Sequence, residues 1–413
     1  MKAFPTWISL KREVSFSGFN RDLNKLVDRV NSYWIEEYHV DGFRFDFTKG
    51  FGNNPKGVDD FLILPGQGDY INPKFLGKEK DTIITGYVTD IITDLTLDWF
   101  KNKRDENKPF LMMYLHKAPH RAWWPRADKF AEFYEKKFPE PKTLFDDYSN
   151  RGSAAKSAEM NLLTHMRYME DSKVWPATIK EMGGAEPEIV YVNEKKNLVR
   201  SNPNQFFSRY GRANDEQKAE YDITLNKISD DFRANWPSMD NTQKMKWKFQ
   251  RYMQDYLATI SSVDDNVGRV LDYLEETGLD KNTIVVYTSD QGFYLGEHGW
   301  FDKRFMYEES LRTPILMKYP KEIKPGSEIN ELIQNLDFAP TFLDYANVEK
   351  PSDIQGESFR KIVSKESSEW RDAIYYTYYE YPSVHMVKRH YGVRTDRYKL
   401  IHFYYDIDKW EMY

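Results

Sequence analysis

YTSDQGFYLGEHGWFDKRFMYEESLRTP, residues 287–314, is the stretch that decides the fold. It places a carboxylate, an amide, a histidine and a lysine directly after TIVVY at 283–287. An apolar run this short and this rich in β-branched residues predicts a buried strand of a parallel sheet. Ligands in open α/β sheets bind at the carboxyl ends of such strands. The stretch therefore predicts a binding site at the edge of an α/β sheet.

The polar residues after this strand are of the types that hold a metal ion and an anion. Asp290 and Gln291 offer hard oxygen atoms, which Ca²⁺ and Mg²⁺ prefer, and Lys303 is a compact cation suited to an oxyanion. Glycines at 292, 296 and 299 let the backbone turn tightly between them. The alternative is structural, because short motifs mislead: an Asp that caps a turn, followed by a surface lysine.

The composition of the 413 residues limits the function classes. With 40% hydrophobic and 30% charged residues the chain is globular, and it is long enough for one large α/β domain or two smaller ones. A net charge of −6 argues against nucleic acid or an anionic membrane as the partner. No apolar run approaches the roughly 20 residues of a membrane span, and the first residues lack the features of a signal peptide. Without cysteine, disulfides and a thiol nucleophile are excluded.

Other apolar patterns predict the elements around the site. Residues 109–115 (PFLMMYL) predict a second buried strand, with His116 and His120 just beyond its end. Residues 253–274 have the apolar spacing of a packed helix, and Gly278 suits the position after a helix end. From about residue 367, IYYTYYEYP and GVRTDRYKLIHFY predict antiparallel strands of a small C-terminal subdomain.

Together these motifs resemble the type I sulfatases of the alkaline-phosphatase superfamily, especially the carbohydrate sulfatases of Bacteroidetes. The resemblance covers residues 58–413 and includes LPGQGDYINP (64–73), KPFLMMYLHKAPHRAWWP (108–125) and DQGFYLGEHGWFDK (290–303). It implies an α/β fold with a mixed, mainly parallel sheet flanked by helices and a small antiparallel α+β subdomain. It also implies a periplasmic or extracellular hydrolase of sulfate esters, with a sulfated carbohydrate as partner.

The resemblance further implies roles for individual residues. Asp290 and Gln291 match the C-terminal metal-ligand pair for Ca²⁺ or Mg²⁺, Lys303 the sulfate-binding lysine, and His120 the histidine at the leaving oxygen or sulfate. Weaker candidates for substrate contact are His116, His298 and Arg304. The alternative for each histidine is a hydrogen-bonded structural role, and the alternative for Arg304 is a surface charge. His385, Arg389 and His390 are rim candidates from the C-terminal subdomain.

Three segments that open family members are missing. These are an apolar strand ending in Asp-Asp, a C/S-x-P-x-R motif whose first residue matures to formylglycine, and a Gly-Lys-x-His segment. Asp59-Asp60, Asp264-Asp265 and Ser201 lie in the wrong context to replace them. Because hard cations need several oxygen ligands and the covalent route needs its nucleophile, we expect this chain to be inactive alone. Because N-terminal strands of the sheet are missing, we also expect marginal stability or aggregation unless residues 1–57 cover the gap, for which the strand at 42–47 is a possible substitute.

The first 57 residues have a different pattern. Residues 21–38 predict an amphipathic helix and 42–47 a strand, and VDGFRFDFTKGF resembles an α-amylase-family barrel strand with Arg44 as anchor and Asp46 as nucleophile. One unit cannot close a barrel, and the second carboxylate of a glycosidase is missing. We therefore expect a vestigial site on a fused or misassembled leader. The predicted domains are 1–57, 58–366 and 367–413.

Alternatives to a carbohydrate sulfatase stay open from the sequence. A phosphodiesterase or phosphonate hydrolase of the same superfamily would share the metal pair, and a non-catalytic product would bind glycans without turnover. A glycosidase would rest on Arg44 and Asp46 alone. The sequence names neither the sugar, nor the sulfate position, nor the oligomeric state.

Overall fold

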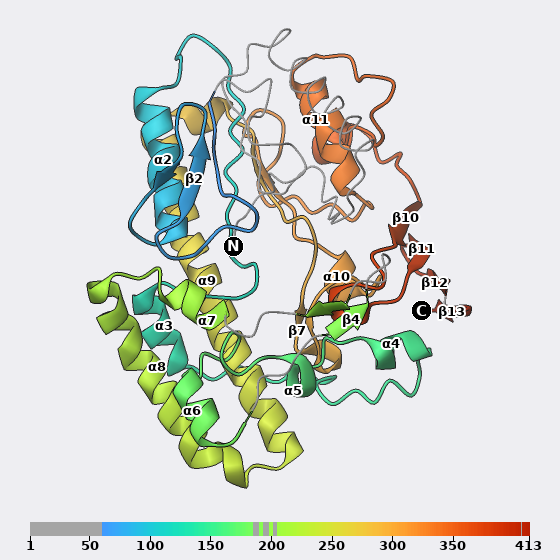
Figure 1. Cartoon of the computed structure of the whole chain (residues 1–413). Coiled ribbons are helices and arrows are strands. Elements are labelled where there is room, and N and C mark those ends of the chain that lie inside the picture. Colours follow the sequence, from blue (N-terminus) through green and yellow to red (C-terminus); the bar gives the residue numbers. More distant parts are fainter. Residues whose placement is uncertain (1–59, 185–189, 193–197, 201–204, 406) are drawn as a thin grey trace. The chain divides into compact units, whose positions relative to one another are not determined.

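The computed structural model describes residues 60–184, 190–192, 198–200, 205–405 and 407–413. The predicted helix 21–38, the predicted strand 42–47 and both amylase-like residues, Arg44 and Asp46, lie outside these ranges. The chain divides into two compact units (Figure 1). Unit 1 contains the residues up to 118, 262–290 and 314–372, and unit 2 contains 119–261, 291–313 and 373–413.

Unit 1 combines short antiparallel sheets with helices. The first sheet has the order β1-β2-β3, and β6 pairs with β9 in a second one. Its elements are β1 (Leu62–Ile63), β2 (Lys74–Gly77), β3 (Thr82–Ile83), α2 (Val88–Asn102), η3 (Leu279–Asn282), β6 (Val285–Tyr287), β9 (Leu316–Lys318), η5 (Asn335–Asp337), α11 (Phe338–Tyr345) and α12 (Arg360–Val363). The long helix α9 (Asn241–Glu276) has residues in both units.

The predictions for the elements near the site have mixed outcomes. The strand predicted at 283–287 exists as β6 at 285–287, but it pairs antiparallel with β9 and not in the predicted parallel sheet. The helix at 253–274 is confirmed within α9, with Gly278 in the left-handed region at φ 70°. The strand predicted at 109–115 is wrong, because these residues join no sheet. A strand exists only with a hydrogen-bonded neighbour. Every strand pair within the described ranges is antiparallel.

Unit 2 is mainly helical before its C-terminal sheet. Helix α8 begins with a capping box, in which Asn214 and Gln217 exchange side-chain and backbone hydrogen bonds, and it packs on α3 (Figure 1). The helices are α3 (Ala127–Tyr134), α4 (Ser153–Ser157), α5 (Leu162–His165), α6 (Pro176–Glu181), α7 (Gln205–Tyr210), α8 (Asp215–Asn235), η2 (Trp236–Ser238), η4 (Glu297–Gly299), α10 (Glu308–Leu311) and η6 (Val384–Met386). None of the helices in the described ranges has the length and apolarity to cross a membrane.

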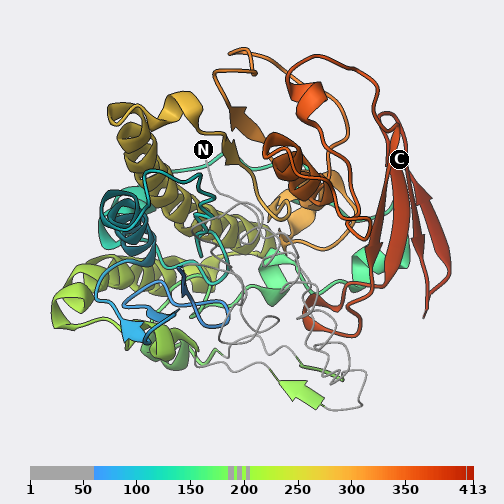
Figure 2. The ribbon, with the colours of Figure 1, turned by 90° about the horizontal axis from the view of Figure 1, so that it is seen from above.

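Antiparallel strands form the C-terminal part of unit 2, as predicted. Four of them pair in chain order, β10-β11-β12-β13, and lie side by side in red in Figure 2. The strands of unit 2 are β4 (Val190–Val192), β5 (Leu198–Arg200), β7 (Tyr294–Leu295), β8 (Phe301–Asp302), β10 (Ala373–Tyr378), β11 (His390–Thr395), β12 (Lys399–Phe403) and β13 (Lys409–Met412).

The two faces of this sheet differ in what they bury. Ile401 and Phe403 point into an apolar core with Trp300 and Phe305. On the other face the register aligns one residue from each strand in a row, and all four are apolar and exposed: Tyr375, Val393, Leu400 and Met412. Met412 is 73% exposed. The sheet therefore presents a row of exposed apolar side chains on this face.

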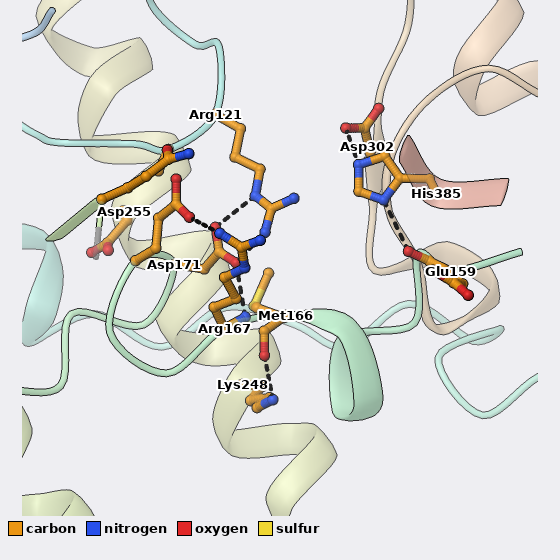
Figure 3. Close-up of polar contacts among 12 residues, drawn as sticks. Arg121, Glu159, Met166, Arg167, Asp171, Lys248, Asp255, Asp302 and His385 are labelled. Atoms are coloured by element: carbon orange, nitrogen blue, oxygen red, sulfur yellow. Dashed lines mark hydrogen bonds and ion pairs between the residues drawn. The ribbon is translucent and has the colours of Figure 1, made fainter. Parts of the chain in front are cut away.

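A buried ionic network lies inside unit 2 (Figure 3). Asp171 is fully buried and accepts two hydrogen bonds from Arg121, at 2.7 and 2.6 Å, and one from the backbone N–H of Arg167. Burial alone would raise the pKa of Asp171, but Arg121 and these hydrogen bonds hold it below its usual range. Paired, hydrogen-bonded charges are the form in which ions are tolerated in an interior.

Replacing Asp171 with Asn tests the importance of this network. We expect the free energy of unfolding to fall by about 3 kcal/mol or more, because Arg121 loses its counter-charge inside the protein. Urea denaturation measures the difference. The matched control is Asp128→Asn, which weakens a surface pair with Arg126 and should cost less than about 1 kcal/mol. Equal losses in the two variants would contradict the assignment.

Candidate functional site

The turn after β6 needs glycine for steric reasons at two positions. A Cβ on Gly292 would lie 2.2 Å from the carbonyl oxygen of Glu309, and the Gly292 N–H donates to the carbonyl of Ser310 at 2.8 Å. Gly296 has φ 98°, and a Cβ there would lie 2.6 Å from the Phe249 ring. Both glycines therefore serve the close packing of this segment within unit 2.

Asp290 and Gln291 follow β6 directly. The carboxylate of Asp290 is half-buried with Ser289 Oγ at 3.4 Å, and its backbone carbonyl accepts a hydrogen bond from Asn335 Nδ2 at 2.8 Å. The described ranges contain no group of three or more His, Asp or Glu side chains placed to hold a metal. One carboxylate and one amide fall short of the six to eight oxygens, roughly, of a Ca²⁺ site. The described residues alone therefore do not complete a metal site.

Lys303 is the least satisfied cation of the candidate set. Its side chain is buried, at 5% residue exposure. Its Nζ lies 4.0 Å from Asp302 Oδ1 and 5.4 Å from the centre of the Phe293 ring, and it donates no hydrogen bond to any described residue. An ammonium group loses its hydration on burial, so it is stable only where an acceptor or an anion is at hand. This arrangement favours an anion at Lys303.

Arg304 hydrogen-bonds the same oxygen of Asp302, Oδ1, that lies 4.0 Å from the Lys303 ammonium. Arg304 Nη1 donates a very short hydrogen bond to Asp302 Oδ1, and its Nε lies 3.7 Å from Glu380. The Arg304 backbone N–H donates to Ser310 Oγ at 2.7 Å, and Tyr376 donates to its carbonyl at 2.8 Å. Arg304 is therefore a half-buried, anchored residue and not a surface charge.

His385 completes a cluster around Asp302 (Figure 3). Its Nε2 lies 3.0 Å from Asp302 Oδ2 and its Nδ1 lies 2.9 Å from the carbonyl of Glu159. Burial would raise the pKa of Asp302, but Arg304, Lys303 and His385 hold it well below its usual range. Burial lowers the pKa of His385 below 6.5 despite the attraction of Asp302. Asp302 is therefore the fixed negative charge of this cluster.

His298 has partners on both sides of its ring. Nδ1 lies 2.7 Å from Asp146 Oδ2, Nε2 lies 3.4 Å from Glu309 Oε1, and the carbonyl accepts a hydrogen bond from Tyr148 at 2.6 Å. Its φ of 60° places it in the left-handed region, where these contacts hold it. The geometry is that of a histidine that joins segments of unit 2.

The two histidines after residues 109–115 belong to different units. His116, in unit 1, is buried, with its ring 4.4 Å from that of Tyr114. His120, in unit 2, is half-buried, and its Nδ1 lies 2.6 Å from the carbonyl of Arg121. Of the rim candidates, Arg389 donates to the carbonyl of Tyr381 at 2.7 Å, and His390 Nδ1 lies 2.8 Å from the carbonyl of Lys388.

Asp302 is the member of this cluster that the sequence analysis did not select. Its signal was its place directly before Lys303 and Arg304 in FDKR, where an acid between an apolar strand and two cations suggests a local counter-charge. His385 lies more than 80 residues away along the chain, and only the fold brings it to Asp302.

Comparisons with known proteins identify the family. Residues 24–348 match the Sulfatase family, and residues 296–413 match the C-terminal domain of N-sulphoglucosamine sulphohydrolase. Members of the sulfatase family use a divalent metal. The first match begins inside the range predicted to be a barrel fragment, and nothing supports an α-amylase relationship there. The prediction of Arg44 and Asp46 as an amylase-like pair has no support, since both positions lie within the residues that match the Sulfatase family.

Individual relatives agree with this family. An N-acetylglucosamine-6-O-sulfatase of Bacteroides thetaiotaomicron is 46% identical over 367 residues, which are 87% of this chain and 62% of the relative. An arylsulfatase of Clostridium perfringens is 34% identical over 133 residues, 32% of this chain and 28% of the relative. An extracellular sulfatase of Drosophila melanogaster is 39% identical over 121 residues, 29% of this chain and 11% of the relative. The chain thus spans less than two thirds of the relatives it matches.

Solved structures show the same fold. A protein in complex with its substrate D-glucosamine-2-N,6-O-disulfate superimposes with a TM-score of 0.82 at 43% identity, over 93% of this chain and 74% of that one. The putative sulfatase of Bacteroides fragilis gives 0.55 at 17% identity, over 93% and 69% of the two chains. The fold is the alkaline-phosphatase-like α/β fold with a C-terminal antiparallel subdomain, as predicted. The chain belongs to the sulfatase family of sulfuric ester hydrolases.

Proposed function

We propose that this chain belongs to a sulfatase that acts on 6-O-sulfated glucosamine units of glycans outside the cytoplasm. The observation that supports the substrate class is the 46% identity, over 367 residues, to an N-acetylglucosamine-6-O-sulfatase. The related solved structure holds a glucosamine with sulfate at N2 and O6. An extracellular sulfatase among the relatives supports the location.

In this proposal Lys303 binds the sulfate group. A buried ammonium that donates no hydrogen bond within the described ranges gains one when an oxyanion enters. Asp302 positions Arg304 by a direct hydrogen bond and lies 4.0 Å from the Lys303 ammonium. His120 would meet the sulfate or the leaving oxygen, Asp290 and Gln291 would supply two oxygen ligands of the metal, and the weaker substrate contacts would be His116, His298 and Arg304.

We further propose that the chain by itself binds substrate but does not turn it over. The 413 residues contain no cysteine and no C/S-x-P-x-R motif, so they offer no residue for the formylglycine nucleophile. Covalent catalysis requires that nucleophile. The metal, when bound, would polarise the sulfate oxygens, but the described residues supply too few of its ligands.

Substitution of Lys303 tests the sulfate contact. We expect Lys303→Met to weaken binding of N-acetylglucosamine-6-sulfate by about tenfold or more, because the charge is lost while most of the apolar stem remains. Isothermal titration calorimetry in calcium-containing buffer measures the dissociation constant. Lys318→Met, which removes an exposed ammonium paired with Asp280, should leave the affinity unchanged. Equal affinity of Lys303→Met and the unmodified chain would contradict the role.

A comparison of sulfate and phosphate ligands distinguishes a sulfatase from a phosphodiesterase or phosphonate hydrolase. A sulfatase site should bind N-acetylglucosamine-6-sulfate at least as tightly as the 6-phosphate, although the phosphate has the higher charge. Competition in the same titration compares the two. Clear preference for the phosphate would favour a phosphodiesterase or phosphonate hydrolase.

Sulfate release tests the second part of the proposal. We expect none above background from the purified chain with N-acetylglucosamine-6-sulfate or an aryl sulfate, because the nucleophile is missing. Ion chromatography detects the product. Release that disappears in Asp290→Ala would refute the proposal, since it would show a working metal site in this chain.

The cluster around Asp302 predicts a pH dependence of stability. The folded-state pKa of His385 lies below 6.5, so protonation below that pH favours the unfolded chain. The stabilisation is complete above pH 6.5 and is lost as pH falls through the lowered pKa. We expect His385→Gln to lose less stability than the unmodified chain when the pH falls from 7 to 5, because glutamine takes up no proton on unfolding. Urea denaturation at both pH values measures the free energy of unfolding of the two proteins. Equal losses on lowering the pH would contradict the role of His385 in this pH dependence.

A further inference from the structure

The guanidinium of Arg304 has a donor that finds no acceptor. Its Nη1 donates to Asp302, but its Nε–H is buried and makes no hydrogen bond within the described ranges. A buried N–H without an acceptor is destabilising, because it loses its hydration and gains nothing in return. Glu380 supplies a carboxylate on this side, with Oε2 3.7 Å from Nε. This separation is that of an ion pair and is too long for a hydrogen bond.

The strand that leads to Glu380 also holds the backbone of Arg304. In β10 the half-buried Tyr376 and Tyr378 lie two residues apart, and both pack against the core of unit 2. The Tyr376 hydroxyl donates to the Arg304 carbonyl at 2.8 Å. Arg304 has φ 109°, a backbone conformation that persists only where the surroundings support it. The Tyr376 hydrogen bond therefore helps to keep the Arg304 backbone in this conformation.

Tyr378 fixes the carboxylate of Glu380. Its hydroxyl donates to the Glu380 carbonyl at 3.0 Å and lies 3.3 Å from Glu380 Oε2. Its ring lies 5.4 Å from that of the buried His390. Burial raises the pKa of Tyr378 well above its usual value, so the hydroxyl keeps its proton and remains a donor. Glu380 Oε2 is thereby held beside Arg304, while 30% of the Glu380 side chain stays exposed.

An arginine that is already oriented binds a ligand more tightly than a free one, because less side-chain entropy is lost on binding. Asp302 restrains Arg304 at Nη1, and Tyr376 restrains it at its carbonyl. Glu380 restrains the Nε side, and all four residues belong to unit 2. The contact with Glu380 is the incomplete one, and a movement of about 0.5 Å would turn it into a hydrogen bond.

We propose that Glu380 is a positioning residue of the sulfated-sugar site, which raises affinity by orienting the Arg304 guanidinium. The inference rests on the proposed function, in which Arg304 contacts the substrate. Glu380 Oε2 accepts the Nε–H of Arg304 when the sugar binds, and Tyr378 keeps that oxygen in place. Through Glu380 the C-terminal strands set the orientation of a side chain in the loop after β8.

A double-mutant cycle tests this role in the full chain. Isothermal titration calorimetry in calcium-containing buffer measures the dissociation constant for N-acetylglucosamine-6-sulfate. We expect Glu380→Ala to weaken binding by about fivefold, because Arg304 must then be ordered on binding. In an Arg304→Met background the same substitution should change the affinity by less than about twofold, since no guanidinium remains to be positioned. Glu380→Gln, which keeps an acceptor oxygen, should lose less affinity than Glu380→Ala.

A spectroscopic measurement separates positioning from a general loss of structure. In protein with ¹⁵N-labelled arginine, the Nε–H signal that disappears in Arg304→Met should shift or broaden in Glu380→Ala. The matched control is Asp408→Ala, which removes a carboxylate that is 87% exposed and lies 2.7 Å from His402 in the same sheet. This control should leave both the Nε–H signal and the affinity unchanged.

The outcomes distinguish this inference from the proposed function. Additive losses in the cycle would overturn the positioning role and assign Glu380 a direct contact with the sugar. Unchanged affinity of Glu380→Ala, or an unchanged Nε–H signal in that variant, would overturn the positioning role and leave the proposed function intact. If the unmodified chain does not bind the sulfated sugar, both are refuted. If Arg304→Met binds too weakly for titration, the Nε–H signal decides.

Discussion

The carboxylate of Asp302 is the interaction on which the candidate site depends. It faces Arg304 and Lys303 of its own loop and His385 of the C-terminal segment, in an interior where burial alone would discharge it. Asp302, Arg304 and His385 all have φ values between 70° and 110°, a backbone region that costs about 1–3 kcal/mol per residue without support. The charged contacts provide that support. Without the Asp302 carboxylate, Lys303 and Arg304 would lose their shared counter-charge beside a strained loop.

Two kinds of buried cation can be distinguished in unit 2. The Arg121 guanidinium donates two hydrogen bonds to the Asp171 carboxylate and lies 4.8 Å from the centre of the Phe301 ring, so its charge is paired within the protein. Lys303 has a carboxylate only at 4.0 Å and an aromatic ring at 5.4 Å. A protein interior tolerates an incompletely satisfied charge only at a cost in stability. We therefore infer that Arg121 stabilises the fold, whereas Lys303 is suited to an external anion.

Local sequence patterns predicted the helices and strands whose formation follows from the periodicity of their own residues. The helix at 253–274, the strand at 283–287 and the C-terminal antiparallel strands follow from periodicity, and the glycines of the decisive stretch lie where a side chain would collide. The segment at 109–115 has an equally apolar sequence, yet forms no strand, because pairing depends on a neighbour that composition does not reveal. The partners of His298 and His385 were also hidden, since Asp146 lies 152 residues from His298 along the chain. The roles assigned to Asp290, Gln291 and His120 came from family resemblance and remain predictions.

The exposed row of Tyr375, Val393, Leu400 and Met412 has a practical consequence. A flat, uncharged strip across four paired strands can meet an identical strip on another molecule. Solutions of this chain should therefore be colloidally unstable at concentrations that a better covered sheet would tolerate. Detergent below its micellar threshold, or arginine in the buffer, would mask the strip, so the choice of buffer decides whether a single molecule or an aggregate is being measured.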